Sequence, residues 1–369
     1  MDTSNLRQSI QTFDPDLVIE RAWTPPSSWY TMEAVHDLER TLWAHTWQLV
    51  AFEHQLRQPG DRVAATVGPV QVVVVRGADG ELRAFHNVCR HKGSTICVGA
   101  DNAPDLVCPY HGWRYGLDGS LESAPQMAGI QDFDRTRMSL PAMSVEQWGP
   151  WIFVNAGTDP SPPLLPEVRP LHKALERTGW RDLRHAGTRS WDIDCNWKVY
   201  CDNYLDGGYH VAHIHPSLGD ELSMETYRTE LFGCFNVQSV GAATGDSQDL
   251  ATAPSTRIGD GALYAWIYPN TMINRYGPVL DVNRVLPVAP NRCVVHFDWW
   301  FDAGCDDDFI RDSMAQSDKI QQEDLEICER VQNGMESGAF DRGRYAPRLE
   351  TAMQHFHCLL SRDLRSALE

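Results

Sequence analysis

The side chains best suited to bind a metal form two Cys/His pairs that are separated by sixteen residues. Cys89 and His91 make the first pair, and Cys108 and His111 make the second, which gives the pattern C-x-H…C-x-x-H. Two thiolates and two imidazoles can hold a tetrahedral zinc ion or a Rieske [2Fe–2S] cluster. Zinc sites usually pair cysteine with cysteine and histidine with histidine. A loop that supplies one cysteine and one histidine favours the cluster, in which one iron binds both cysteines and the other binds both histidines.

Residues 196–216 hold a second group of potential ligands, which includes His210, His213 and His215. Two histidines and one carboxylate form the facial triad of oxygen-activating non-haem iron, which leaves three coordination positions open. On an ideal helix His210 and His213 lie about 60° apart, whereas His210 and His215 lie about 140° apart. The second pair converges only if the helix ends between them, and Pro216 restricts that end. Spacing alone leaves the choice open.

A carboxylate for such a triad is available in a later segment. Apolar residues recur at helical spacing between Ile320 and Val331, and Asp324 falls on the same stripe. Burying a carboxylate is costly unless it is paired or bound to a metal, so we predict that Asp324 is the third ligand. The alternative is an aspartate bonded to a buried arginine or to a helix end. Glu323 points about 100° away and is expected to be solvated.

Around the first group, the sequence predicts a small β domain. Residues 63–67 and 70–76 are β-branched runs, and a turn at residues 78–80 leads into residues 81–86. Runs of this kind joined by glycine-containing turns are typical of hairpins. Residues 151–154 have the composition of a closing strand.

The rest of the chain predicts a mixture of helices and strands. A proline-rich stretch at residues 159–163, followed by Pro166 and Pro170, predicts a linker. The other expected elements are helix and loop over residues 6–47, a helix over 196–213, strands at 264–268 and 293–300, and a long helix over about 309–335.

The composition narrows the class of protein. The chain has 369 residues, enough for two domains, and its formal net charge of −18 disfavours binding to nucleic acid. Its ten cysteines do not resemble a secreted disulfide scaffold in a chain of this length. The first fifteen residues carry no signal-peptide pattern, and no apolar run is long enough to span a membrane. We therefore expect a cytoplasmic protein without nucleic-acid or membrane partners.

Taken together, these motifs resemble the catalytic α-subunits of Rieske non-haem iron oxygenases, the aromatic-ring-hydroxylating dioxygenase family, over nearly the whole chain. Within that family the chain is most similar to the branch of choline monooxygenase-like members. The segments that carry the resemblance are residues 23–30, 86–89, 108–113, 196–199, 202–206, 343–345 and 355–358.

The resemblance implies an α+β fold in three parts. Residues 1–44 would form a helical segment that packs with the catalytic domain, residues 45–158 an all-β Rieske [2Fe–2S] domain, and residues 159–369 a helix-grip (START-like) domain with a large antiparallel sheet and the mononuclear Fe(II). The family places its iron histidines five residues apart, so the resemblance favours His210 and His215. It makes His213 a neighbouring or surface residue, and it matches Asp324 to the third ligand. The usual assembly is a homotrimer in which the cluster of one subunit supplies the iron of the next.

The chain departs from the family at one position. Most members carry an acidic residue three positions before the first iron histidine, where it bridges a cluster histidine to an iron histidine; here that position is Gly207. Asp206 lies four residues before His210, on the same face of a helix. We therefore take Asp206 as the bridging candidate and Asp202 as the substitute, with Asn203 as a further catalytic candidate. The alternative is that these carboxylates only cap or solvate a helix end.

Aromatic residues in the C-terminal half suggest the substrate class. Quaternary ammonium groups bind to aromatic faces through cation–π attraction, although any one of these rings can equally be a core residue. Alternation along a strand would put residues 264, 266 and 268 on one face. The candidate residues are Tyr264, Trp266, Tyr268 and Tyr276.

The expected function is oxygenation of a small molecule with dioxygen and with electrons that a separate reductase takes from NAD(P)H. The leading substrate is choline or a betaine-like compound, which would be hydroxylated or N-demethylated, and the sequence leaves open whether one or two oxygen atoms enter. An aromatic acid or heterocycle is the alternative, with Arg275 or Arg284 to bind a carboxylate. From other classes, the chain could be a Rieske electron-transfer protein without catalysis or a small-molecule sensor.

Overall fold

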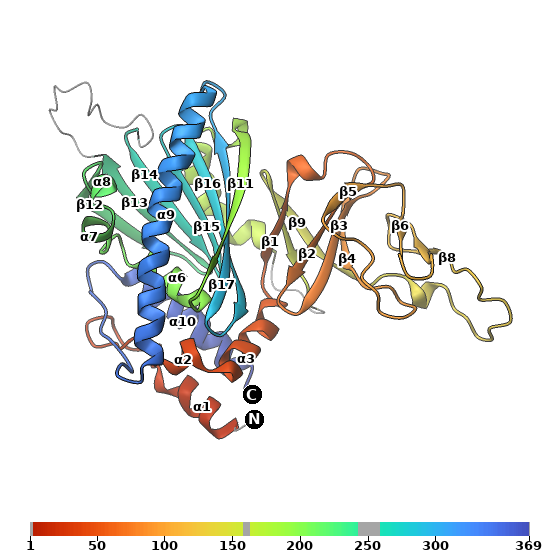
Figure 1. Cartoon of the computed structure of the whole chain (residues 1–369), viewed down its shortest axis with the longest axis horizontal. Coiled ribbons are helices and arrows are strands. Elements are labelled where there is room, and N and C mark those ends of the chain that lie inside the picture. The colour runs from red at the N-terminus through yellow and green to blue at the C-terminus, as the bar shows by residue number, and fades with distance from the viewer. Residues whose placement is uncertain (1–2, 158–162, 243–258, 369) are drawn as a thin grey trace. The chain divides into compact units, whose positions relative to one another are not determined.

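The structure, a computed structural model, describes residues 3–157, 163–242 and 259–368. The chain forms two compact units, and Figure 1 labels most of their elements. The first, called here the β unit, is residues 40–166, and the second, called the helix–sheet unit, is residues 1–39 with 167–369. No helix within the described ranges has the length and hydrophobicity that a membrane span needs.

The β unit contains a seven-stranded antiparallel sheet and a separate three-stranded one. The first has the strand order β1-β10-β9-β4-β3-β2-β5 and the second the order β6-β7-β8. The strands are β1 (Gln48–Phe52), β2 (Asp61–Val67), β3 (Val70–Arg76), β4 (Leu82–His86), β5 (Ala100–Asn102), β6 (Leu106–Val107), β7 (Arg114–Tyr115), β8 (Leu121–Ser123), β9 (Ala142–Trp148) and β10 (Trp151–Asn155).

Strand β3 shows how the sheet of the β unit supports the first ligand group. Its side chains alternate between the two faces, as the period of a strand requires. Val72 and Val74 pack in a core with Ile152, whereas Val73 and Val75 pack in a second core that contains the cysteines of the ligand loops. The β-branched runs therefore bury both faces of the sheet, and one of those faces is the floor beneath the ligand loops.

The helix–sheet unit is built on a second seven-stranded antiparallel sheet, in the order β11-β17-β16-β15-β14-β13-β12, with helices α6 and α9 packed on it (Figure 1). Its strands are β11 (Arg184–Ile193), β12 (Leu222–Leu231), β13 (Phe235–Ala242), β14 (Gly261–Ile267), β15 (Thr271–Tyr276), β16 (Val279–Ala289) and β17 (Arg292–Phe301). The α-helices among the described residues are α1 (Thr3–Thr12), α2 (Ser28–Thr31), α3 (Glu33–Trp43), α4 (Leu164–Glu167), α5 (Arg169–Glu176), α6 (Trp197–Leu205), α7 (Val211–Ile214), α8 (Pro216–Gly219), α9 (Asp307–Glu336) and α10 (Thr351–Ser366).

The predicted helix over residues 196–213 is wrong beyond Leu205. Helix α6 begins as expected, because the side chain of Asn196 accepts a hydrogen bond of 3.0 Å from the backbone N–H of Lys198. It ends before two consecutive glycines, Gly207 and Gly208, whose φ angles are 72° and 74°. This left-handed conformation suits glycine and cannot continue a right-handed helix. The chain then restarts as α7, so the histidines lie on two short turns rather than on one helix.

The long helix α9 is confirmed, but its buried face differs from the predicted apolar stripe. The carboxylate of Asp306 accepts a hydrogen bond of 2.8 Å from the backbone N–H of Phe309 and fixes the start of the helix. Val331 is exposed, and the buried side chains of the helix include Gln321 and Gln332 as well as Asp324. The face of α9 that packs in the unit is therefore more polar than its sequence pattern suggested.

The remaining sequence predictions have mixed outcomes. The strands at residues 264–268 and 293–300 correspond to β14 and β17. The boundary between the two units, between Pro166 and Glu167, falls within the stretch predicted as a linker. Pro166 and Pro170 themselves lie in the short helices α4 and α5, where proline is tolerated in the first turn. Residues 159–162 lie outside the described residues. The expected α+β class with a large antiparallel sheet is confirmed.

Candidate metal centres and substrate pocket

Two short loops of the β unit present the four predicted cluster ligands. The loop after β4 carries Cys89 and His91, and the loop between β6 and β7 carries Cys108 and His111. The two loops have matching turns: the backbone N–H of a glycine four residues after each cysteine donates to that cysteine's carbonyl at 3.0 Å. Both glycines, at positions 93 and 112, have positive φ angles. Such a repeated turn orients one cysteine and one histidine side chain of each loop in the same way.

The arrangement of these side chains fits a [2Fe–2S] group. Both cysteines are buried, and the rings of His91 and His111 lie 4.6 Å apart between centroids. The indole of Trp113 stacks on His91 at 4.9 Å. The Nδ1 atom of His91 is buried and has no hydrogen-bond partner among the described residues, as expected for a nitrogen that faces a metal.

Tyr115, on β7, is a residue of this site that the sequence did not reveal. Its hydroxyl lies 3.3 Å from Cys89 Sγ and accepts a hydrogen bond of 3.0 Å from the backbone N–H of Arg90. A hydroxyl donor beside a ligating sulfur is one of the factors that set the reduction potential of a cluster.

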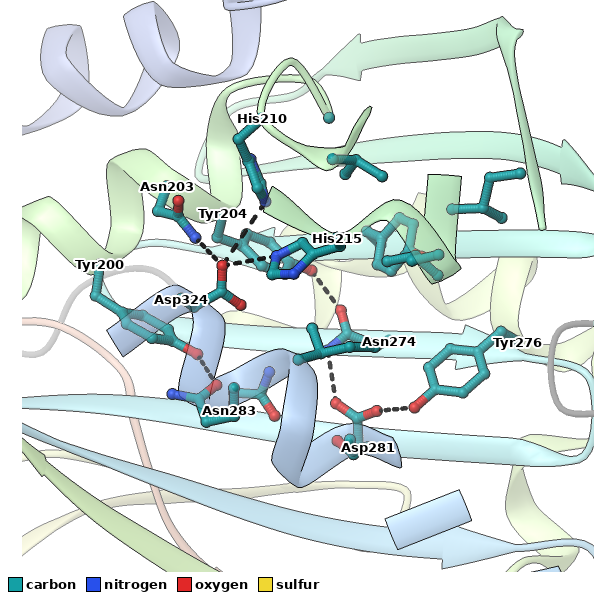
Figure 2. Close-up of a pocket in the computed structure, with 18 of the residues that line it drawn as sticks. Tyr200, Asn203, Tyr204, His210, His215, Asn274, Tyr276, Asp281, Asn283 and Asp324 are labelled. Atoms are coloured by element: carbon teal, nitrogen blue, oxygen red, sulfur yellow. Dashed lines mark hydrogen bonds and ion pairs between the residues drawn. The ribbon is translucent and has the colours of Figure 1, made fainter. Parts of the chain in front are cut away.

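The second ligand group comes together in the helix–sheet unit (Figure 2). His210 precedes α7, His215 lies between α7 and α8, and Asp324 lies on α9. One ligand atom from each lies within 4.8 Å of the other two. Asp324 Oδ1 is 2.9 Å from His215 Nε2 and 3.8 Å from His210 Nε2. Donors on adjacent positions of one metal would be roughly 3 Å apart, so the group fits a small divalent ion.

The same geometry favours one of the two histidine pairs that spacing left open, His210 with His215. His213 is exposed and does not belong to the group, because the break after α6 turns His210 and His215 toward each other with ring centroids 5.1 Å apart. The Nε2 atoms of both rings face Asp324, and three positions of an octahedral ion would remain open for small molecules.

Each histidine is held through its other nitrogen by a carboxylate. His210 Nδ1 lies 2.7 Å from Asp206 Oδ2, and His215 Nδ1 lies 2.8 Å from Glu323 Oε2. Such partners fix the tautomer and the ring orientation of a ligating histidine. Burial alone would lower the pKa of His215, but its hydrogen bonds to Asp324 and Glu323 raise it above its ordinary value. The expectation that Glu323 is merely solvated is wrong, because its side chain orients His215.

Asp206 contacts the His210 ring and also caps the turn beside it, and its role as a bridge to a cluster histidine stays a prediction. Besides contacting the His210 ring, its carboxylate accepts hydrogen bonds of 3.0 Å from the backbone N–H groups of Tyr209 and His210, and so caps the turn that leads into α7. Position 207 has no room for an acidic side chain. A Cβ atom on Gly207 would overlap the backbone carbonyl of Leu349.

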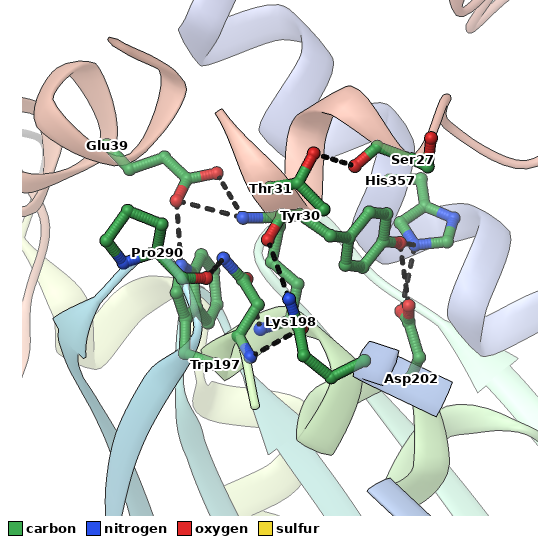
Figure 3. A network of polar contacts seen from close by, with 11 residues as sticks. Ser27, Tyr30, Thr31, Glu39, Trp197, Lys198, Asp202, Pro290 and His357 are labelled. Atoms are coloured by element: carbon green, nitrogen blue, oxygen red, sulfur yellow. Dashed lines mark hydrogen bonds and ion pairs between the residues drawn. The ribbon is translucent and has the colours of Figure 1, made fainter. Parts of the chain in front are cut away.

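Asp202 and Asn203 have different surroundings from Asp206. The Asp202 carboxylate accepts a hydrogen bond of 2.7 Å from Tyr30 and lies 2.8 Å from His357 Nε2 (Figure 3). This places it in a polar network beside the buried ion pair of Lys198 and Glu39 (Figure 3). Asn203 instead donates a hydrogen bond of 2.8 Å to Asp324 Oδ1, in direct contact with the ligand group.

The ligand group opens on a cavity of about 140 Å³ that is rich in aromatic rings (Figure 2). Of the four predicted substrate residues, Tyr264 and Tyr276 line this cavity. Trp266 and Tyr268 do not line it. Trp266 is on the same face of β14 as Tyr264, but its ring packs against Phe356 of α10. The rings that line the cavity are Tyr200, Tyr204, Tyr227, Tyr264, Tyr276 and Phe297.

The arginines that could have bound an aromatic acid lie elsewhere. The guanidinium of Arg275 is 3.2 Å from Asp302, and that of Arg284 is 3.1 Å from Asp298. Neither arginine lines the cavity. On the sheet side, the cavity is lined by the carboxylate of Asp281, which the sequence analysis did not predict as a site residue.

Two family profiles match the chain. The profile described as "Rieske [2Fe-2S] domain" matches residues 46–134, and the profile described as "Ring hydroxylating alpha subunit (catalytic domain)" matches residues 180–366. The first range contains all four predicted cluster ligands, and the second contains the His/His/Asp group.

Individual relatives are similar over most of their length. The chain is 41% identical to the chloroplastic choline monooxygenase of Arabidopsis thaliana, over 98% of this chain and 88% of that protein. It is 30% identical to the carnitine monooxygenase oxygenase subunit of Acinetobacter pittii, over 86% of this chain and 87% of that protein. Among solved structures, the quaternary ammonium Rieske monooxygenase CntA in complex with L-carnitine matches with a TM-score of 0.80 and 26% identity, over 95% of this chain and 97% of that one.

Proposed function

The chain belongs to the family of Rieske ring-hydroxylating oxygenases, and on that premise we propose that it hydroxylates a quaternary ammonium compound. As a member it is an oxidoreductase with a Rieske [2Fe–2S] cluster and a mononuclear iron, and it receives electrons from a reductase. One oxygen atom of dioxygen enters a C–H bond, and the other leaves as water with two electrons and two protons. A hydroxyl placed on the alcohol carbon or on a carbon bonded to nitrogen collapses to an aldehyde, by loss of water or of the amine respectively.

The observation that carries the proposal is the aromatic cavity beside the His/His/Asp group. Aromatic faces attract quaternary ammonium ions through their quadrupoles, most strongly where water is excluded. Five tyrosines and one phenylalanine line this cavity, and two of the tyrosines, Tyr264 and Tyr276, were substrate candidates on sequence grounds. The named activities of the relatives, choline and carnitine monooxygenase, concern substrates with the same trimethylammonium group.

We assign the metal ligands by the chemistry of the two donor sets. Cys89, Cys108, His91 and His111 would hold the cluster. His210, His215 and Asp324 would hold the iron, which when bound supplies the site where dioxygen is activated. The chain's own contribution is to hold the histidine rings through Asp206 and Glu323, and to present the substrate in a cavity rich in aromatic rings.

We further propose that electrons reach the iron between subunits of a homotrimer, with Asp206 as the bridge. Its contact with His210 Nδ1 is 2.7 Å, and the one acceptor position that its three hydrogen bonds leave, on Oδ1, is suited to a cluster histidine of a neighbouring copy. A solved structure of a quaternary ammonium Rieske monooxygenase, 27% identical to this chain, gives insights into inter-subunit electron transfer in that protein. Light scattering of the purified chain tests the trimer, and a monomer with full activity would refute it.

The cytoplasm is our proposed location for the chain. The relatives include chloroplast proteins, so the location needs its own test. Fractionation of the native cells shows whether this protein is in the cytoplasm together with an NAD(P)H-dependent reductase. Recovery in an organelle or an extracellular fraction would refute the location.

Turnover of the fully loaded protein with an NAD(P)H-dependent reductase tests the substrate class. We expect choline or a related methylammonium compound to stimulate NAD(P)H oxidation and oxygen uptake, with an aldehyde as product. If methylammonium compounds are neither consumed nor stimulate NAD(P)H use, while an aromatic acid or heterocycle is hydroxylated, the proposed substrate class is wrong.

A further inference from the structure

A second cavity, of about 240 Å³, adjoins helix α6. One water molecule needs only about 10–15 Å³ of such space, so the cavity has room for several. Val331 and Phe340, which line it, are exposed, so bulk water can enter. Asn203 lines this cavity as well as the aromatic one, and its amide donates to Asp324. Water from the surface can therefore come within one side chain of the His/His/Asp group.

Three side chains that line the second cavity belong to one continuous row of hydrogen bonds. The hydroxyl of Tyr30 donates to Asp202 Oδ2 at 2.7 Å, and Asp202 Oδ1 lies 2.8 Å from His357 Nε2 (Figure 3). The row continues to Tyr345, whose hydroxyl lies 2.7 Å from His357 Nδ1. Each distance is that of a good hydrogen bond, so a proton can move along the row without a rearrangement of side chains.

The central pair of the row, Asp202 and His357, is suited to hold a transferable proton. An imidazole binds a proton at either nitrogen, and histidine is the side chain that ordinarily gains and loses one between about pH 5 and 8. His357 Nε2 faces the carboxylate, while Nδ1 accepts from Tyr345 or, once protonated, donates to it. Only 1% of the His357 side chain is exposed, against 17% of that of Asp202. Asp202 is therefore the member through which the pair meets water.

The tyrosines at the two ends of the row remain protonated. Burial and the charge of Asp202 raise the pKa of both Tyr30 and Tyr345. The ammonium group of Lys198 lies 5.3 Å from the ring centroid of Tyr30, and it pairs with Glu39 at 2.8 Å. That cation is thus matched by a carboxylate of its own. The tyrosines orient the central pair, and the proton that moves is the one shared by Asp202 and His357.

Two further carboxyl groups line the second cavity. They belong to Asp206, on the turn after α6, and to Glu350, next to the start of α10. Burial raises the pKa of Glu350, and the charges of Asp206 and Asp202 raise it further. Carboxylates that face one another across one space favour the uptake of a proton, because each charge raises the proton affinity of the others. The second cavity therefore draws protons from bulk water.

We propose that Asp202 and His357 form a proton relay, which supplies protons from the second cavity for the reduction of dioxygen. The inference rests on the proposed function, in which each hydroxylation consumes two protons and two electrons and releases one oxygen atom as water. His357, protonated at both nitrogens, gives its Nε2 proton to Asp202 Oδ1. The carboxyl group passes the proton to a water molecule beside Asn203, and a proton from bulk water later restores the pair. This gives Asp202 a role other than that of an electron bridge.

The first test replaces His357 with glutamine, which can hydrogen-bond to both neighbours but cannot take up a proton. With choline, dioxygen and the reductase we expect kcat to fall at least about tenfold, because cavity water only partly replaces a donor that contributes about 10²–10⁴-fold. The solvent isotope effect on kcat should increase in D₂O, and the KM for choline should stay unchanged. A residue that only pins α10 against α6 would leave the isotope effect as it is in the wild type.

Matched variants keep the result interpretable. Asp202→Asn should reproduce the effects of His357→Gln, and the double variant should be no slower than either, because both groups act on one path. His172→Gln removes an imidazole of α5 that is not among the residues lining either cavity, so it should leave kcat and the isotope effect unchanged. Iron content, sulfide content and choline affinity by calorimetry should equal those of the wild type in every variant.

A spectroscopic measurement tests the relay without turnover. In ¹⁵N NMR of histidine-labelled protein, with zinc in place of the mononuclear iron, the His357 ring should pass between one and two bound protons within the pH range of turnover. Its signals are those missing from His357→Gln. A ring that keeps the same number of protons from about pH 5 to pH 8 would refute the relay.

The outcomes separate the relay from the proposed function. Wild-type kcat and isotope effect in both His357→Gln and Asp202→Asn would refute the relay and leave the oxygenase function standing. If methylammonium compounds are not substrates but another compound is hydroxylated, the substrate class is wrong, and the same variants test the relay on that compound. If the variants do not fold, the pH dependence of the wild-type NMR signals decides.

Discussion

Asp206 Oδ2 lies 2.7 Å from the Nδ1 atom of His210, across a turn that is made by two glycines in the left-handed conformation. The contact gives the His/His/Asp group a carboxylate-held histidine without an acidic side chain at position 207, which is a glycine. The backbone of Leu349 occupies the space that a side chain at position 207 would need, so the acid is carried one residue earlier.

Asp206→Asn tests the role of this carboxylate. The amide keeps the size of the side chain but loses the charge that holds and polarises His210, so we expect turnover to fall by at least about 10- to 100-fold at saturating iron. Iron and sulfide content should be unchanged, and rapid-mixing absorbance should show that the reduced cluster is reoxidised slowly. Undiminished activity would refute the role.

Gly207→Ala tests why the turn needs glycine. The new Cβ would require a positive φ and would overlap the carbonyl of Leu349, so we expect a loss of about 1–3 kcal/mol in stability and a lower iron content. Gly304→Ala is the matched control, because no atom lies within 4 Å of its added Cβ. Equal melting temperatures for the two variants would show that the turn tolerates a side chain.

Glu323→Gln tests the orientation of His215. A neutral amide holds the ring less firmly, so we expect the affinity for iron to fall by about 10- to 100-fold, with the cluster unaffected. Glu326→Gln on the same helix is the control, because Glu326 is largely exposed and pairs only loosely with Arg330 at 4.0 Å. Competition with a chelator gives both affinities, and identical values would contradict the assignment.

Glu350→Gln tests the electrostatics behind the iron site. Burial raises the pKa of Glu350, and the charges of Asp206 and Asp202 raise it further, against a hydrogen bond from the backbone of Ala346. Between its ordinary and its raised pKa the folded state binds more protons than the unfolded state, so wild-type stability falls as pH rises through that window. The variant should therefore melt at a higher temperature than wild type near pH 8, with a smaller difference near pH 5. A difference that does not change with pH would contradict this.

The sequence indicated which ligand candidates the structure brings together, but it did not indicate the contacts around them. The residue types and spacing of the two Cys/His pairs indicate metal binding by themselves. Asp324 could be singled out because a carboxylate on a core-facing stripe needs a partner. The choice of His210 and His215 over His213 depends on the helix break after Leu205. The two adjacent glycines signalled that break, but spacing on an ideal helix could not include it.

Other parts of the site depend on tertiary structure that one sequence does not specify. Glu323 contacts a histidine 108 residues earlier in the chain, so its helical position alone suggested only a solvated side chain. Asp281 enters the cavity because the register of three strands aligns it with Asn274 and Tyr264. Conversely, Trp266 satisfies the same alternation as Tyr264 but is covered by Phe356 of α10.

The most direct test measures iron and acid-labile sulfide per chain on the anaerobically purified wild type and on Asp324→Ala. It decides whether the chain carries an oxygen-activating iron in addition to its cluster. We expect about three irons and two sulfides for the wild type, and about two irons and two sulfides for the variant, with the same Rieske EPR signal in both. The variant should also lose substrate-dependent oxygen uptake. Two irons in the wild type, or three retained in Asp324→Ala, would contradict the assignment of His210, His215 and Asp324 as the oxygen-activating site.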